Sequence, residues 1–296
     1  MGSIESGDIV PGAPIKVDRE TATTAVIDGG NNFGQVSAFQ ALEVGMTMAD
    51  KQNTSTVLLH RCNHVGRLGA YPQRAAEQNL ICIATANYVK MGHSVAPFGG
   101  RQGRLGTNPV AYGIPTAGKP ILADFATSVM AEGKIRVQRN KGGELPDQAV
   151  LKPAGDVTRD PYEFYGPPRG AILPFGGPVG YKGFALSLLV EVLGGALLGR
   201  LIDDPDIRGN GVCFILLKPE AFTGLEAFKS LVGETQRYLK DTPTATGFDE
   251  VILPGEIEFR TWEKRSVEGI SLDDATWSQI LEMADKAGTK IDVPSS

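Results

Sequence analysis

The chain has 296 residues, long enough for one large domain or two smaller ones with a sizeable core. Hydrophobic residues make up 42% and charged residues 21%, which is typical of a soluble globular protein. The formal net charge is −5 and Lys and Arg form no basic stripe, so a nucleic-acid-binding surface is not expected.

Without a recognisable secretory signal or membrane span, and given its three cysteines, the protein is expected in the cytoplasm. The apolar stretch 184–198 contains Glu191 and several glycines, and it falls short of the ~20 apolar residues that a membrane span needs. No basic segment followed by an apolar one opens the chain, so no secretory signal is expected. Cys62, Cys82 and Cys213 are an odd number without CxxC spacing, which favours reduced, buried thiols over disulfides or a metal site.

The first third of the chain alternates predicted strands with predicted helices. Residues 1–20 mix Gly, Pro and charge, so we expect an extended arm without a core of its own. The alternation after it is typical of α/β units with a largely parallel sheet. β-Branched runs predict strands, and apolar residues at three- and four-residue steps predict helices, at 21–27, 35–49, 55–60, 68–78 and 80–85.

A second organising feature is the stretch 106–134. It combines a Gly-Thr-Asn-Pro turn, an apolar run ending at Asp124, a hydroxyl-rich turn at 126–128 and the start of a helix, which together outline a cofactor site. No GxGxxG follows the first predicted strand, so a dinucleotide would bind by another device than the Rossmann turn.

The rest of the chain divides less regularly. Residues 142–177 are rich in Pro and Gly, as in functional lids or oligomer arms. We expect an arm at 1–20, an α/β domain from 21–105 and 180–296, and a cofactor-binding segment with a long loop at 106–179. Further helices are predicted at 181–198, 225–239, 254–268 and 273–287, the last capped by Asp273 or Asp274, and a strand at 212–217.

Three histidines are the first candidates for proton transfer. His64 lies between a predicted strand and a predicted helix, and residues at strand ends of α/β proteins face the ligand crevice. Imidazole moves protons readily near neutral pH, so His64 is either a functional residue or a polar loop residue. We expect a satisfied, half-buried His60 and a surface position for His93.

Asn87, Tyr88 and Lys90 follow the next predicted strand and should lie at the same edge of the sheet. Tyr88 is either a substrate-orienting phenol or a half-buried packing residue. Lys90 is either a second proton donor or a solvated side chain.

Six motifs in order carry a resemblance to a known family: Asn63-His64-Val65-Gly66, Leu105-Gly106-Thr107-Asn108-Pro109, Asp124-Phe125-Ala126-Thr127-Ser128, Gly133-Lys134, Gly177 to Tyr181-Lys182-Gly183 and Leu253-Pro254-Gly255-Glu256. Over roughly residues 7–290 the chain resembles the malate/L-lactate dehydrogenase family, which lacks a Rossmann fold and includes ureidoglycolate, sulfolactate and diketogulonate dehydrogenases. Residues 95–100 and 132–141 resemble most the subgroup called hydroxycarboxylate dehydrogenase B.

The resemblance implies a non-Rossmann α/β fold with a mixed sheet and flanking helices, NAD or NADP as cofactor, and a homodimer that shares its active sites. It implies that His64 is the proton donor and acceptor, with Tyr88 where the family often has a substrate-binding Ser. Tyr88 and Lys90 are further catalytic candidates because of their position after the predicted strand. The candidate substrate-binding residues are Asn63, Arg67, Tyr88 and Arg104. The implied cofactor-binding residues are Thr107, Asn108, Asp124, Phe125, Ala126, Thr127, Ser128, Lys134, Gly176, Gly177, Tyr181, Lys182 and Gly183.

Family members generally begin with a further helical segment that carries a Ser-His-Gly motif and an Arg, and this sequence starts after the corresponding position. We expect one of Arg61, Arg67, Arg101 and Arg104 to hold a substrate carboxylate instead. Three functions stay open: reduction of a 2-oxo acid, imine or related carbonyl; a non-redox biosynthetic reaction by an isomerase, lyase or cyclase; and a binding or regulatory role without turnover.

Overall fold

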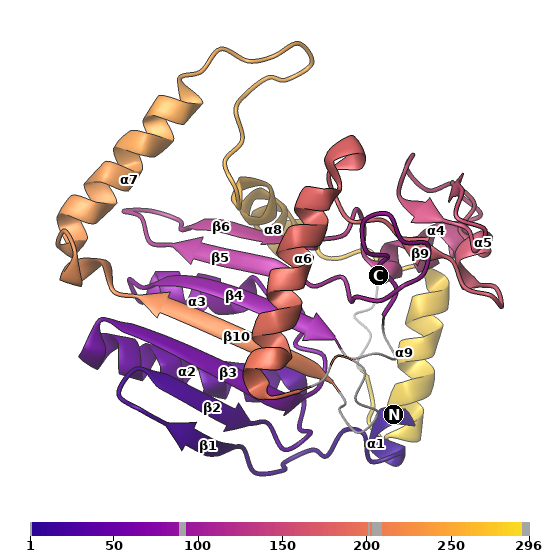
Figure 1. Cartoon of the computed structure of the whole chain (residues 1–296), viewed down its shortest axis with the longest axis horizontal. Coiled ribbons are helices and arrows are strands. Elements are labelled where there is room, and N and C mark those ends of the chain that lie inside the picture. The colour runs from indigo at the N-terminus through magenta and orange to yellow at the C-terminus, as the bar shows by residue number, and fades with distance from the viewer. Residues whose placement is uncertain (1, 89–92, 201, 203–208, 292–296) are drawn as a thin grey trace.

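A seven-stranded sheet forms the centre of the protein (Figure 1). The computed structural model describes residues 2–88, 93–200, 202 and 209–291. The strands follow the order β1-β2-β3-β10-β4-β5-β6 across the sheet. Their bounds are β1 Lys16–Glu20, β2 Thr24–Asp28, β3 Thr54–Cys62, β4 Ile81–Tyr88, β5 Val110–Ile114, β6 Ile121–Phe125 and β10 Asn210–Leu217.

The expectation of a largely parallel sheet is wrong. Among the described strands of this sheet, β2 and β3 form the one parallel pair, and every other neighbouring pair is antiparallel. β2, β3 and β4 do run in the same direction, but β10 inserts between β3 and β4 in the opposite direction. Hydrophobic patterning cannot reveal that a strand from far along the chain inserts between two others. The sequence therefore suggested that β3 and β4 pair directly, whereas β10 lies between them. The mixed sheet with flanking helices that the resemblance implied is confirmed.

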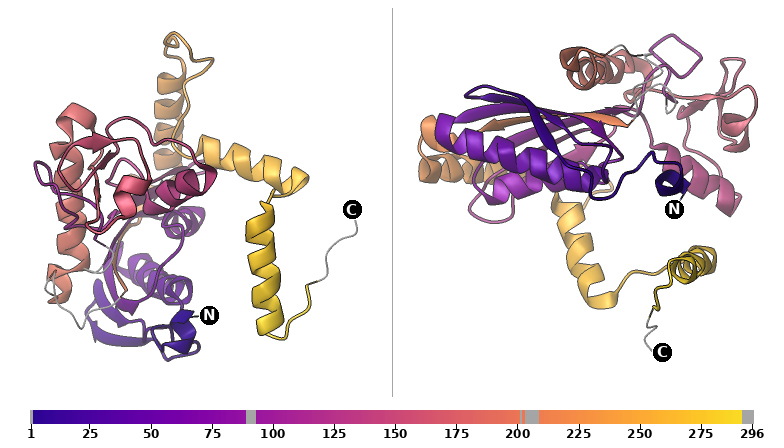
Figure 2. Two further views of the ribbon diagram at one scale, coloured as in Figure 1. Left: turned by 90° about the vertical axis from the view of Figure 1, so that its right-hand side faces the viewer. Right: turned by 90° about the horizontal axis from the view of Figure 1, so that it is seen from below.

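Helices cover the two faces of the sheet differently. α2 (Gly34–Gln52) and α3 (Ala70–Glu77) pack on one face, and α6 (Tyr181–Gly194) crosses the other over β4 and β10 (Figures 1 and 2). The main core lies between the sheet and α2 and α3, where the buried rings of Tyr71 and Phe214 are 5.5 Å apart. All three helices were predicted from their apolar spacing.

A smaller lobe has its own core. It contains α4 (Glu132–Lys141), α5 (Tyr162–Tyr165) and a three-stranded sheet in the order β8-β7-β9. Phe164 and Ile172 are fully buried there, and Val95 and Leu105 join them. The Pro- and Gly-rich region therefore carries short elements rather than one long loop. Its strands are β7 Val150–Leu151, β8 Val157–Thr158 and β9 Ala171–Ile172.

The N-terminal arm is more regular than expected. It contains a short helix, α1 (Gly2–Glu5), and the edge strand β1, whose five side chains are all exposed. β1 forms through backbone pairing with β2, as in the pair Lys16 and Asp28. Because no buried side chain marks this strand, its composition gave no periodic signal.

The C-terminal helices stand away from the body (Figures 1 and 2). They are α7 (Leu225–Lys240), α8 (Glu256–Glu268) and α9 (Asp274–Lys286), and the described residues of α7 and α8 include no buried side chain. Asp273 caps α9, as predicted, by accepting a hydrogen bond from the Thr276 N–H at 2.9 Å. Three short 3₁₀ turns complete the described elements: η2 Gly177–Val179, η3 Ala196–Leu198 and η4 Pro219–Ala221.

One segment is apolar enough to raise the question of a membrane. Tyr181–Leu198 passes the test of length and composition for a membrane span. Its inner face, however, packs on the sheet and carries Ser187 and Glu191, both buried. The apolar residues on this inner face are explained by packing against the sheet, because helices in the core of a globular protein have a similar composition.

A glycine at the start of α2 supports the loop that carries His64. A Cβ atom on Gly34 would collide with the backbone carbonyl oxygens of Asn63 and His64. We predict that Gly34→Ala lowers the free energy of unfolding by about 1–3 kcal/mol, because backbone at this contact has to move. Gly133→Ala is the matched control: it also lies in a first helical turn but has open space, so its effect should stay within about 1 kcal/mol and be stabilising. Urea unfolding measures both, and equal effects would contradict the prediction.

Candidate active site

One edge of the sheet collects most of the predicted site residues. β3, β4 and β6 end at this edge, while β10 and β5 begin there (Figure 1). Asn210, the first residue of β10, pairs with both Cys62 and Tyr88. His64 follows Cys62 by two residues, so β10 alone separates the His64 loop from Tyr88. Two strand spacings amount to roughly 10 Å, a distance that one small substrate can bridge.

His64 is exposed and held by its own loop. The Gly66 N–H donates to His64 Nδ1 at 3.0 Å. Because Nδ1 accepts this hydrogen bond, the neutral ring carries its proton on Nε2. Gly66 has a φ of 72°, which favours glycine at this turn. The loop therefore leaves Nε2 as the nitrogen that can reach a substrate.

Asn63 connects the His64 loop to neighbouring segments. Its side-chain Nδ2 lies within hydrogen-bond distance of the carbonyl oxygens of Asp8 at 3.1 Å, Asn31 at 2.9 Å and Asn32 at 3.1 Å. These contacts tie the His64 loop to the N-terminal arm and to the loop before α2. The amide nitrogen is thus engaged within the protein, and a substrate contact of Asn63 stays a prediction.

Tyr88 is partly exposed at the end of β4. His93 Nε2 lies 3.0 Å from the Tyr88 carbonyl oxygen, so His93 contacts the same segment. A Cβ atom on Gly106 would lie 3.3 Å from Tyr88 Cβ, which places the start of the 106–134 stretch directly beside Tyr88. Lys90 lies outside the described residues.

The predictions for His60 and for the three cysteines are confirmed. His60 is half-buried and its Nε2 lies 2.7 Å from Asp18 Oδ2, as expected of a satisfied imidazole. Cys62, Cys82 and Cys213 are free and buried. Burial raises the pKa of Cys62 to about 12, so this thiol stays protonated although it adjoins the site.

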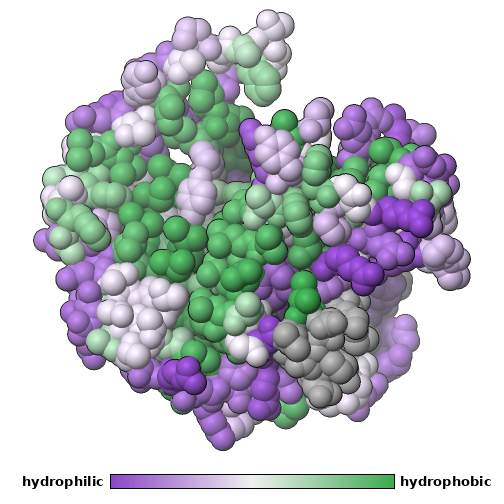
Figure 3. Space-filling view, in the orientation of Figure 1, coloured by the Kyte–Doolittle hydropathy of each residue, from purple (hydrophilic) through white to green (hydrophobic). Residues whose placement is uncertain are grey.

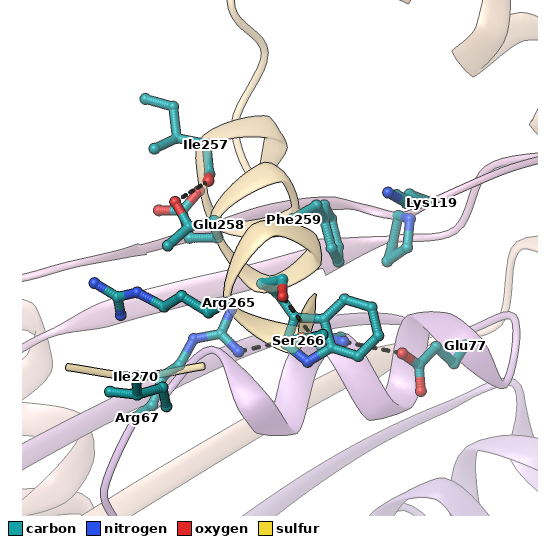
Figure 4. A pocket seen from close by; sticks show the side chains of 13 residues that line it. Arg67, Glu77, Lys119, Ile257, Glu258, Phe259, Arg265, Ser266 and Ile270 are labelled. Carbon is teal, nitrogen blue, oxygen red and sulfur yellow. Dashed lines mark hydrogen bonds between the residues drawn. The ribbon is translucent and has the colours of Figure 1, made fainter. Parts of the chain in front are cut away.

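The predicted arginines do not converge. Arg67 is exposed and its Nη1 donates to Gln73 Oε1 at 3.2 Å. It lines a cavity of about 800 Å³ between α3 and α8, together with Trp262 and Arg265 (Figure 4). Arg104 is exposed on the smaller lobe, where it contacts Gln102. Arg67 is therefore the arginine that follows His64 most closely and opens onto a cavity.

Asp124, near the end of β6, links this strand to the start of α3. Its Oδ2 accepts a hydrogen bond from the Gly69 N–H at 2.7 Å. Burial raises the pKa of the Asp124 carboxyl, while the Gly69 N–H and the charge of Arg67 act in the opposite direction. Asp124 thus sits next to the His64–Arg67 loop as well as next to the predicted cofactor turn.

The hydroxyl turn predicted for the cofactor is internally bonded. Thr127 and Ser128 are buried, and their hydroxyls donate to the carbonyl oxygens of Thr107 at 3.1 Å and Met130 at 2.9 Å. The Phe175 N–H donates to the Thr127 carbonyl oxygen at 3.0 Å. The loop that follows, which contains Gly176 and Gly177 and is called the glycine loop below, therefore lies against this turn. These two side chains shape the turn, and any cofactor contact from them stays a prediction.

Groups suited to a nicotinamide dinucleotide surround that turn. Gly176 and Gly177 have φ values of 116° and 53°, and beside Gly177 the nearest atom to an added Cβ is 3.9 Å away, which leaves room for a pyrophosphate. Lys134 and Lys182 are exposed cations in the first turns of α4 and α6. The aromatic rings of Phe125 and Tyr181, in the same group of residues, are exposed. The chemistry of these residues fits the cofactor.

Two further predicted cofactor residues, Gly183 and Asn108, are buried within the protein, and a cofactor contact from them stays a prediction. A Cβ atom on Gly183 would collide with the Phe175 carbonyl oxygen, so glycine at this position lets α6 approach the glycine loop. Asn108 is buried too, and its Nδ2 donates to Glu191 Oε2 at 3.0 Å. Glu191 was not predicted as a site residue, and the one signal for it was a single acidic residue in an apolar helix.

Comparison with known proteins agrees with this geometry. The family model described as malate/L-lactate dehydrogenase matches residues 1–281. The malate dehydrogenase of Pyrococcus abyssi is 35% identical over 98% of this chain and 82% of its own length. Hydroxycarboxylate dehydrogenase B of Escherichia coli is 32% identical over 92% of this chain and 76% of its own. The crystal structure of malate dehydrogenase from Entamoeba histolytica matches 99% of this chain and 84% of its own with a TM-score of 0.90 at 29% identity. The chain therefore belongs to the malate/L-lactate dehydrogenase family of NAD(P)-dependent oxidoreductases, and its cofactor is NAD or NADP.

Proposed function

We propose that the protein reduces the carbonyl of a 2-oxo acid, or a related imine, with His64 as the general acid and base. The observation that carries this proposal is the placement of His64, Tyr88 and the turn after β6 at one edge of the sheet. Relatives named for malate, sulfolactate and lactate support a 2-hydroxy acid as the product.

The proposed reaction divides the work between cofactor and protein. When bound, NADH or NADPH supplies the hydride to the carbonyl carbon. His64 Nε2 donates a hydrogen bond to the carbonyl oxygen and, in the protonated ring, gives that oxygen its proton. Oxidation of the alcohol reverses these steps: Nε2 of the neutral ring that carries its proton on Nδ1 takes the hydroxyl proton. Protonation of Nδ1 requires the contact with the Gly66 N–H to open, so turnover involves a small movement of this loop.

Recognition of the substrate falls to residues on either side of His64. The Tyr88 hydroxyl is suited to hydrogen bonding with a polar substrate group, and its bulk narrows the pocket relative to a Ser. Arg67, three residues after His64, is the exposed cation suited to a carboxylate. The assignment of Tyr88 follows from its position at the sheet edge, and the assignment of Arg67 follows from its place in the loop that carries His64. Both form part of the proposal.

We also propose that the protein is a homodimer. Exposed apolar side chains gather on the outer face of α6 and beside it on the open face of the sheet, where Figure 3 shows a continuous hydrophobic surface. Surfaces of this kind mark protein interfaces, since water contact with a large apolar patch is unfavourable. The exposed residues of this patch include Ile83, Leu188, Leu189, Val192 and Leu197.

His64→Ala should lower kcat by at least about 100-fold, because the oxygen then lacks its proton donor, while the Kd for NADH or NADPH changes by less than about threefold. Fluorescence titration gives the Kd, and nicotinamide absorbance against 2-oxo acids and cyclic imines gives kcat. His60→Ala, which removes a histidine bonded to Asp18, is the control and should retain turnover. An unchanged rate in His64→Ala would remove this residue from the mechanism. Consumption of a substrate without any absorbance change would instead favour the isomerase, lyase or cyclase function.

Leu189→Glu should convert the dimer into monomers, because it puts a charge in the centre of the apolar surface on α6. Light scattering coupled to gel filtration measures the mass. Tyr162→Glu is the control, since Tyr162 is an exposed side chain of the smaller lobe, outside the α6 surface. A monomeric wild-type protein would refute the dimer.

A further inference from the structure

A buried carboxylate lies behind the active-site edge. Glu191, on α6, is 6% exposed. Its Oε1 accepts a hydrogen bond from Asn87 Nδ2 at 2.9 Å, and its Oε2 accepts one from Asn108 Nδ2 at 3.0 Å. Burying a carboxylate lowers the stability of the folded protein unless its oxygens accept hydrogen bonds. The two hydrogen bonds of Glu191 therefore call for an explanation.

The two amides belong to the two sides of the proposed site. Asn87 directly precedes Tyr88, and Asn108 directly follows Thr107. Asn87 lies in β4, and Asn108 lies two residues before β5, beyond the last register pair of the two strands, Thr85 and Val110. The Ala86 N–H still donates to the Pro109 carbonyl oxygen at 3.3 Å, but Pro109 has no N–H to continue the ladder. The Glu191 side chain therefore connects the two segments next to their last backbone hydrogen bond.

The helix reaches this point because two glycines, Gly194 and Gly211, remove side chains from the contact. A Cβ atom on Gly194 would lie 2.7 Å from both Asn87 Oδ1 and the Gly211 carbonyl oxygen. The Gly211 N–H donates to Asn87 Oδ1 at 2.8 Å, so both polar atoms of the Asn87 side chain are engaged. At its other end, α6 presses Gly183 onto the glycine loop. One helix thus contacts both the Tyr88 side and the cofactor turn.

We propose that Glu191 is a positioning residue that fixes Tyr88 relative to the turn at residues 106–109, called the Thr107 turn. It does so by holding Asn87 and Asn108 with the two oxygens of one carboxylate. The inference rests on the proposed function, which assigns Tyr88 to the substrate and the Thr107 turn to the cofactor.

A carboxylate is the group that serves two amide donors at once. Alanine at this position would remove the carboxylate acceptor of the buried Asn87 Nδ2, whereas Asn108 Nδ2 would keep the Ser187 carbonyl oxygen, at 3.1 Å, as its remaining acceptor. Glutamine keeps one acceptor and adds a donor, and Asn108 Oδ1, which is buried and has no partner, can accept that donor once its amide turns. The glutamine variant is thus a conservative rescue of the alanine variant.

The test separates the two sides of the site. Asn87→Ala should lower kcat by about 10- to 100-fold with the NADH or NADPH Kd near wild type, because a catalytic geometry altered by about 1 Å costs that much. Asn108→Ala should raise that Kd. Glu191→Ala should do both, and Glu191→Gln should fall between alanine and wild type. Glu191→Ala combined with Asn87→Ala should lower kcat by clearly less than the product of the two single effects, since both variants remove the hydrogen bond between Asn87 and Glu191.

Ser55→Ala is the control for a merely structural role. It removes another buried hydrogen bond, from Ser55 Oγ to the Gly45 carbonyl oxygen at 2.7 Å, at the far end of β3. It should lower the Tm and leave kcat and the cofactor Kd unchanged. If Glu191→Ala behaves in the same way, or if the double variant is additive in kcat, the proposal is overturned. If Glu191→Ala does not fold, Glu191→Gln and the two Asn variants carry the same test. Wild-type protein that binds neither NADH nor NADPH would refute the proposed function rather than this inference.

Discussion

The antiparallel insertion of β10 between β3 and β4 is the constraint on which the site depends. Because Asn210 pairs with Cys62 on one side and Tyr88 on the other, the His64 loop and the end of β4 have a fixed separation. β3 and β4 run in the same direction and are joined through α3, so without β10 they would be direct neighbours with their ends one strand spacing apart. The inserted strand sets the separation of roughly 10 Å that the proposed substrate between His64 and Tyr88 would span.

Close packing of backbone on backbone sets the second dimension of the site. Gly34 lets α2 begin directly beneath the His64 loop, and Gly183 and Gly194 let both ends of α6 lie against loops and strands at the site. Contacts of this kind leave little freedom for movement, because protein interiors are as densely packed as crystals. The loops at the sheet edge are therefore positioned by rigid elements, although the chemistry comes from exposed residues.

The sequence indicated the elements better than their arrangement. Apolar spacing predicted α2, α3 and α6, and Asp273 was recognised as a cap, because these signals lie within a few residues of one another. The place of β10 depends on pairings with residues far away in the sequence, which periodicity does not record. The motifs likewise marked Asn108 and Asn63 as site residues, but they did not reveal that the Asn108 side chain bonds to Glu191 or that the Asn63 side chain bonds to the arm. A motif records that a residue type is required, and the contacts show what requires it.

α6 connects the site with the proposed subunit interface. Its inner face carries Glu191 and contacts Asn87 and Asn108, whereas its outer face exposes Leu188 and Leu189. A second copy that covers the outer face would stabilise the helix in the position that the inner face requires, because binding to the folded state shifts the equilibrium toward it. Association and active-site geometry would then be linked through one helix. This linkage gives a physical reason for a long apolar helix to contain one buried carboxylate: the apolar residues serve the two packing surfaces, and Glu191 sets the helix in register with the strands that carry the chemistry.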